Sequence, residues 1–106
     1  MVLKENQDHS ITLEEAAKMT ASYRKTITSS DVRAAAFGKK AITEILNQDG
    51  CIGMRMYYAK NDDGNITLVL VGMKEDGNDM YDENLAEWAA LCPPFCNPSK
   101  NPLNCD

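Results

Sequence analysis

The sequence contains few of the groups that enzymes rely on. Its single histidine, His9, lies near the N-terminus, so no Ser–His or Cys–His catalytic pair is expected. No glycine-rich loop opens a predicted helix, which argues against a phosphate-binding site. Neighbouring carboxylates such as Glu14 and Glu15 point apart on a helix and are typical of a solvated face. The sequence leaves catalysis open and favours a protein that is not an enzyme.

Long apolar runs and clustered basic residues are also missing. No apolar stretch approaches the roughly 20 residues that span a bilayer. Residues 1–10 are polar and lack the apolar centre of a secretory signal, so with Met1 as the start we expect a cytoplasmic protein with no membrane contact. The 11 Lys and Arg residues are scattered and the formal net charge is −5. This charge pattern argues against nucleic-acid binding.

Four cysteines are the candidate metal ligands. Cys92, Cys96 and Cys105 lie close together in sequence and could supply a thiolate site for zinc, with His9 or Cys51 as a fourth ligand. The chain has one C-x₃-C spacing and no second cysteine pair. Free thiols are therefore the leading expectation, while a disulfide and a metal site both stay open. No cofactor is predicted.

Two helices are predicted in the N-terminal half. Thr12, with Glu15 three residues later, forms a capping box that opens a helix reaching about residue 27. Residues 1–11 before it are an expected tail. A second helix is expected from residue 30 or 31 to about residue 47, with alanine-rich packing in its first half, and Gly50 lies just beyond its end.

A β-hairpin gives the clearest signal. Cys51–Lys60 and Ile66–Lys74 are rich in strand-forming residues, and residues 61–65 between them are Asn, Asp and Gly, which tolerate turn conformations. If Lys60 faces Ile66, one face of the hairpin is apolar throughout and must be covered by helices. The second face is about half apolar, since it carries Tyr57, Val69, Val71 and Met73.

The last predicted element is a short helix over residues 82–91. Leu85, Trp88 and Ala89 recur at helical spacing and are expected to pack on the apolar face of the hairpin. Prolines end this helix, and residues 93–106 form an irregular Pro/Cys-rich tail. The predicted fold is therefore a single α+β domain over residues 1–106.

Parts of the chain resemble known families. Residues 36–38, the run over residues 50–58 and the Cys-Pro-Pro-x-Cys motif at Cys92 are similar to a family of small bacterial proteins without an assigned activity. That resemblance covers about residues 10–106 and implies one self-contained domain. A helix, a hairpin and C-terminal cysteines are also similar to A-type iron–sulfur carriers. Those carriers end in a C-x-C pair that this chain lacks, so their function is not carried over.

We expect a non-enzymatic protein-interaction or regulatory module that forms a homodimer and binds an unidentified protein partner. An isolated hairpin leaves backbone groups unpaired on both edges, and pairing two hairpins edge to edge or stacking them face to face would satisfy them. The alternative is a thiol-based metal or iron–sulfur protein that uses Cys92, Cys96 and Cys105.

Overall fold

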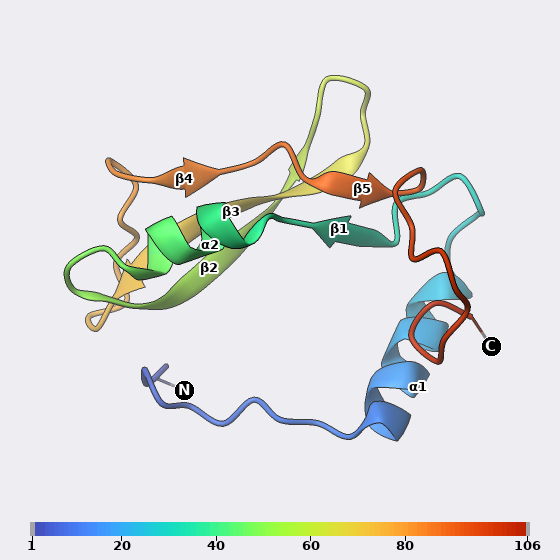
Figure 1. Ribbon diagram of the computed structural model, residues 1–106, viewed down its shortest axis with the longest axis horizontal. Helices are drawn as coiled ribbons and strands as arrows, with labels where there is room; N and C mark the ends of the chain where they lie inside the picture. Colours follow the sequence, from blue (N-terminus) through green and yellow to red (C-terminus); the bar gives the residue numbers. More distant parts are fainter. Residues whose placement is uncertain (1, 106) are drawn as a thin grey trace.

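The computed structural model describes residues 2–105 and has an α+β fold with antiparallel sheets (Figure 1). Within this range the elements follow in the order α1 (Leu13–Arg24), β1 (Ala34–Ala36), α2 (Lys39–Leu46), β2 (Cys51–Lys60), β3 (Ile66–Lys74), β4 (Leu85–Ala86) and β5 (Ala90–Cys92). Strands β2, β3 and β4 form one sheet in that order, and β1 pairs with β5 in a second. The predicted fold class is confirmed.

The hairpin of β2 and β3 has the predicted strand limits and register. Lys60 pairs with Ile66, and the pairing continues to a bulge between Cys51 and Gly53. In the connecting loop, Asn61 Oδ1 accepts hydrogen bonds from the backbone N–H groups of two following residues. Gly64 has a φ of 81°, a conformation that favours glycine. Local turn chemistry therefore fixes this part of the fold.

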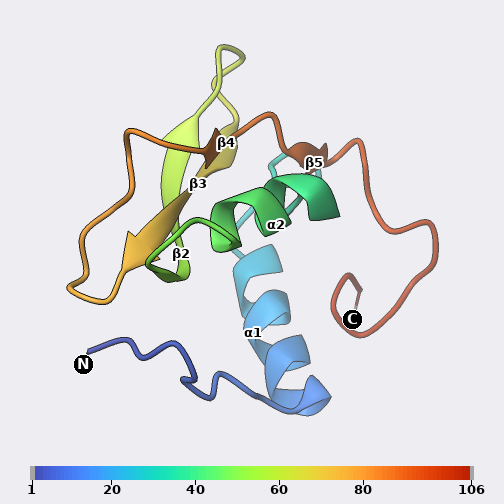
Figure 2. The same ribbon diagram turned by 60° about the vertical axis from the view of Figure 1, so that its left-hand side comes forward.

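Helix α1 is capped as predicted but packs loosely. Thr12 accepts a hydrogen bond from the backbone N–H of Glu15 at 3.1 Å, which fixes the start of the helix. None of its residues is buried. Its last turn is held by a bond from Arg24 Nη1 to the Leu103 carbonyl at 2.8 Å. Helix α1 therefore lies beside the C-terminal tail, and α2 is the helix that contacts the hairpin (Figure 2).

The second predicted helix is wrong in its first half. Residues 34–36 form β1, which pairs with β5 so that Ala35 faces Leu91. The Asp31 carboxylate accepts the N–H of Thr28 upstream at 2.9 Å, so it stabilises a turn instead of capping a helix that follows. Alanine favours helix by well under 1 kcal/mol per residue. A partner strand overrides so small a preference, and α2 begins only after Gly38.

The third predicted helix is also wrong. Residues 82–91 contain β4 and β5 with Trp88 between them in the left-handed region, at a φ of 62°. Trp88 is 92% exposed, so it does not pack on the hairpin. Leu85 does pair with Val71 of β3, yet it remains half exposed. The spacing of apolar residues fits a helix, but backbone pairing with two different strands decides the structure.

The core is small and lies between α2 and the middle of the hairpin. Ile45 of α2 and Leu70 of β3 are each 1% exposed. A Cβ on Gly72 would lie 2.8 Å from Gln48 Nε2 and 3.2 Å from Met80 Sδ, so the helix end and the 80s segment approach the backbone closely there. This packing covers the centre of the apolar face, as the sequence required.

The second face of the hairpin is better covered than the sequence indicates. Val71 and Met73 on this face are buried. The tail residue Leu3 lies 3.4 Å from where a Cβ on Gly53 would stand, so residues near the N-terminus cover part of this face. Stacking two copies through Val71 is therefore not compatible with the fold. A lysine at position 71 would unfold the monomer.

Candidate functional site

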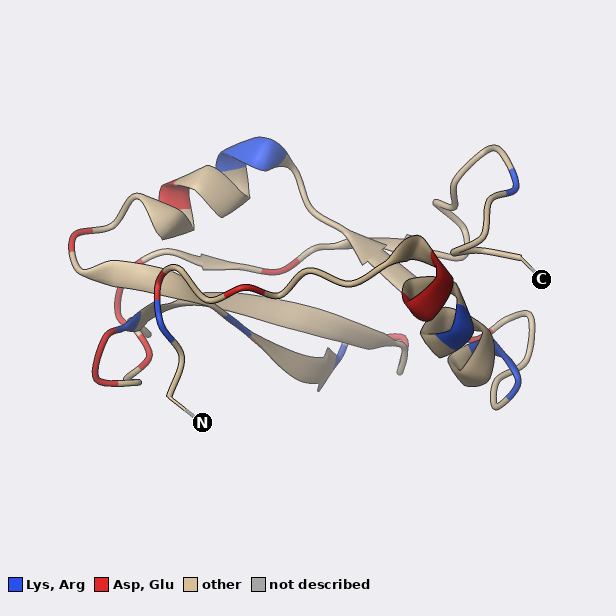
Figure 3. Ribbon diagram, turned by 90° about the horizontal axis from the view of Figure 1, so that it is seen from below, with Lys and Arg blue, Asp and Glu red and all other residues tan. Residues whose placement is uncertain are grey.

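The outer edge of β2 carries no partner strand in the described part of the chain. β2 is the terminal strand of its sheet, with β3 on one side only. It is ten residues long and contains no proline. Arg55 and Lys60 are its only charged residues, and Figure 3 shows the Lys and Arg residues spread along the chain and not gathered at this edge. Long, flat, weakly charged edges are the ones that pair with another chain.

The hydrogen bonds of β3 show which backbone groups of β2 face outward. Gly72 accepts from the N–H of Met80, and Lys74 donates to the carbonyl of Asn78, so even-numbered residues of β3 point away from β2. From Ile66 to Gly72 their partners on β2 are even-numbered too, for example Met54 opposite Gly72, whereas beyond the bulge Lys74 pairs with Cys51. In an antiparallel ladder both members of such a pair turn their N–H and C=O groups outward. The open edge therefore presents these groups at Met54, Met56, Tyr58 and Lys60.

Large apolar side chains flank the same edge. Met56 and Tyr58 on the first face are 53% and 86% exposed, and Tyr57 on the second face is 49% exposed. Helix α2 covers the centre of the first face and leaves this distal half uncovered. Exposed aromatic residues and methionine are enriched at protein interfaces. The edge and its side chains together form a candidate interaction surface, which we define as the outer edge of β2 over residues 54–60.

A cluster of three polar side chains fastens the turn after β3 to β2. Arg55 and Tyr57 donate hydrogen bonds to the two carboxylate oxygens of Asp79, and Arg55 Nη1 also donates to the Gly77 carbonyl at 3.0 Å. The hydrogen bond from Tyr57, together with Arg55, lowers the pKa of Asp79, and the same bond to Asp79 raises the pKa of Tyr57. This cluster was missed in the sequence, although Arg55 and Tyr57 share a face and an acidic turn follows β3.

We expect the stability that this cluster contributes to be lost at both ends of the pH range. The folded pKa of Asp79 lies below its ordinary 3.8, so its contribution is present above that pH and is lost as pH falls. The folded pKa of Tyr57 lies above 10.0, so its contribution is lost as pH rises past that value. In urea unfolding across this range, Asp79→Asn should reduce the fall in the free energy of unfolding at low pH. Tyr57→Phe should reduce the fall at high pH. Unchanged slopes in both variants would contradict this role.

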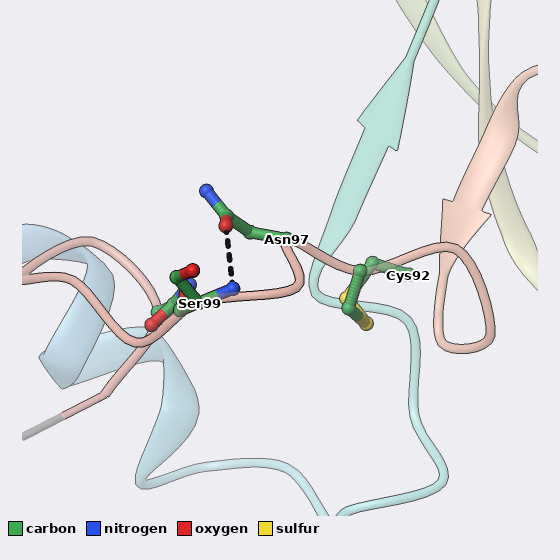
Figure 4. The surroundings of a disulfide bond; sticks show 5 residues. Cys92, Asn97 and Ser99 are labelled. Carbon is green, nitrogen blue, oxygen red and sulfur yellow. Dashed lines mark hydrogen bonds between the residues drawn. A yellow bond between two sulfur atoms is a disulfide. The ribbon is translucent and has the colours of Figure 1, made fainter.

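Two of the candidate cysteines are joined to each other in the structure, and the other two are free. Cys92 and Cys96 form a disulfide with a Cα–Cα distance of 4.7 Å, beside a turn in which Asn97 accepts the N–H of Ser99 (Figure 4). Cys105 bonds to the Asn101 carbonyl at 3.4 Å, and Cys51 bonds to the Gly53 carbonyl at 3.1 Å. His9 is exposed in the N-terminal segment. Within residues 2–105, no three His, Cys, Asp or Glu side chains are grouped to hold a metal ion.

The described residues thus define a small α+β protein built on an open-edged hairpin. Comparison of the chain with models of protein families, with curated proteins and with solved structures finds no match. Over residues 2–105, no helix is both long and apolar enough to cross a bilayer.

Proposed function

We propose that this protein is a non-enzymatic interaction module that self-associates by pairing the outer edges of β2 from two copies. The observation that supports this most strongly is the unpaired edge over residues 54–60. Two-fold symmetry makes such an interface self-complementary, because each strand offers the same donors and acceptors to its copy. The pairing would join two three-stranded sheets into one continuous sheet.

The side chains favour a two-fold axis near Met56. Antiparallel pairing about that residue sets Met54 opposite Tyr58 of the second copy and keeps the two Lys60 ammonium groups apart at opposite ends. The charge of Arg55 is already balanced by Asp79 within each chain. Little like-charge repulsion therefore opposes this register.

The surface area of the chain also supports association. The accessible surface is 8128 Å², whereas a monomeric protein of 11.7 kDa is expected to expose roughly 5,900 Å². The excess of roughly 2,200 Å² is more than the ~800 Å² that each partner buries in a standard interface. The chain therefore has enough uncovered surface to form a stable dimer.

Sedimentation equilibrium at micromolar concentration tests the proposal. We expect the wild type to have twice the chain mass of 11.7 kDa. Met56→Pro removes an outward N–H without breaking a hairpin bond, so it should give a folded monomer. Met56→Lys should weaken the dimer through its charge. Met19→Lys on α1 is the matched control, because Met19 is also an exposed methionine (67% against 53% for Met56) but lies away from β2, and it should leave the dimer intact.

Two results would contradict edge pairing. A wild-type protein that stays at 11.7 kDa would exclude self-association under these conditions. A folded Met56→Pro variant that remains a dimer would place the interface elsewhere on the chain. Circular dichroism of each variant verifies that the monomer is folded.

A further inference from the structure

A second open edge lies on the other side of the hairpin. A cavity of about 480 Å³ is lined by residues 66–68 at the start of β3 and, opposite them, by residues 32–35 leading into β1. Both sets are consecutive, and consecutive residues of a strand alternate between its faces. A cavity that touches every residue in turn therefore lies along strand edges, and Tyr58 of β2 and Tyr23 of α1 extend its lining over the adjoining face. We call this cavity the β3–β1 slot.

The slot exists because β4 covers only part of β3. β4 pairs with β3 at Leu70 and Val71 alone. The chain then passes through Trp88, whose left-handed backbone conformation separates β4 from β5, and β5 pairs with β1 instead (Figure 1). Residues 66–68 of β3 are therefore left without a strand on their outer edge in the described part of the chain.

An unpaired polar group marks the same place. Thr67 lines the slot and is only 2% exposed, yet its Oγ1 has no hydrogen-bond partner among residues 2–105. Buried hydroxyl groups in folded proteins are almost always hydrogen-bonded. The described chain therefore leaves this hydroxyl, which is itself shielded from solvent, without a partner beside the slot.

The charge of the slot indicates what kind of partner fits. Among the described residues that line it, Arg33 is the one charged residue and none is acidic. The rest of the lining is mainly apolar and includes the exposed side chains of Tyr58 and Ile66. A partner with alternating apolar side chains and one carboxylate would match both the walls and the guanidinium.

We propose that the β3–β1 slot binds an extended, acidic peptide segment of another protein as an added strand along residues 66–68. The peptide backbone pairs with the open edge of β3, which is the recognition mode called β-augmentation. A carboxylate of the peptide lies against Arg33. The open edge of β3 lies on the opposite side of the hairpin from the outer edge of β2, although Tyr58 belongs both to the slot lining and to the β2 edge.

The test uses the full chain labelled with ¹⁵N and a capped probe peptide, Thr-Val-Glu-Val-Thr-Val. Saturable amide shifts are expected at residues 32–35 and 66–68. Methylating alternate backbone nitrogens of the probe removes the N–H groups that would donate hydrogen bonds to β3. This change should weaken binding at least tenfold. This comparison needs no protein variant, so it does not depend on how a variant folds.

Variants then test the side-chain chemistry. Arg33→Glu should reverse the preference, so that a probe with Lys in place of Glu binds better than the original. Thr67→Val keeps the shape of a side chain whose hydroxyl is shielded from solvent, so it should leave binding unchanged. Lys100→Glu carries the same charge change on an exposed tail residue that does not line the slot, and it should bind the original probe as the wild type does.

Four results would overturn the proposal. The probe could fail to bind, or bind equally well after N-methylation, or shift amides elsewhere. Concentration-dependent shifts at residues 66–68 without any peptide would show that a second copy of this chain occupies the slot, which also excludes the proposed partner. Because the Met56→Pro variant leaves this edge intact, it should still bind the probe as a monomer, which separates this proposal from the dimer.

Discussion

Replacing Leu70 by alanine should lower the free energy of unfolding by about 2–5 kcal/mol. Leu70 is 1% exposed and lies in the middle strand of the sheet, paired with Met56 on one side and Ala86 on the other. Removing its side chain leaves a cavity that the surrounding strands cannot fill. Because a domain is typically stable by only about 5–15 kcal/mol, the variant should be close to unfolding at room temperature.

Urea unfolding followed by circular dichroism measures this loss. Trp88→Ala is the control, since Trp88 is the larger side chain but is 92% exposed. Exposed substitutions usually change stability by about 0.5 kcal/mol or less, whereas a buried tryptophan costs about 3–5 kcal/mol. Equal losses in the two variants would mean that Trp88 is buried and that the chain between β4 and β5 is placed differently.

Reduction of the Cys92–Cys96 disulfide should cost about 2 kcal/mol of stability. The bond closes a loop of about five residues, and the loop-entropy relation gives about that value for so short a loop. Unfolding curves with and without a phosphine reductant should therefore differ for the wild type and coincide for Cys96→Ser. Wild-type curves that do not respond to reductant would show that the two cysteines are not joined in solution.

Elemental analysis completes this test of the cysteines. Reducing compartments keep such a pair as thiols, and oxidising compartments keep it as a disulfide. We expect no stoichiometric metal in the oxidised protein, because both Cys92 sulfur and Cys96 sulfur are then unavailable as thiolates. One equivalent of zinc or iron per chain, lost in Cys92→Ser, would instead support the alternative of a thiolate metal site.

Part of the candidate site could be predicted from the sequence. An isolated hairpin must have two open edges, and the register that fixes the outward groups of β2 follows from the loop at residues 61–65. The Arg55–Asp79 contact could not be predicted in the same way, because Asp79 belongs to a turn whose path depends on the pairing of Met80 with Gly72. The Cys92–Cys96 bond was one of several alternatives that spacing alone leaves open.

The sequence by itself determined the elements whose information is local. The Thr12 cap needs only the N–H of Glu15, and the hairpin needs only two neighbouring strands and their loop. The pairing of β1 with β5 was decided by the tertiary structure, because its strands lie far apart in the sequence and each is three residues long. In short segments the helix and strand preferences differ by less than the free energy gained by pairing with one neighbouring strand. The apolar spacing over residues 82–91 therefore fits either structure. The break at Trp88, which leaves the edge of β3 open, therefore depends on how the whole chain packs.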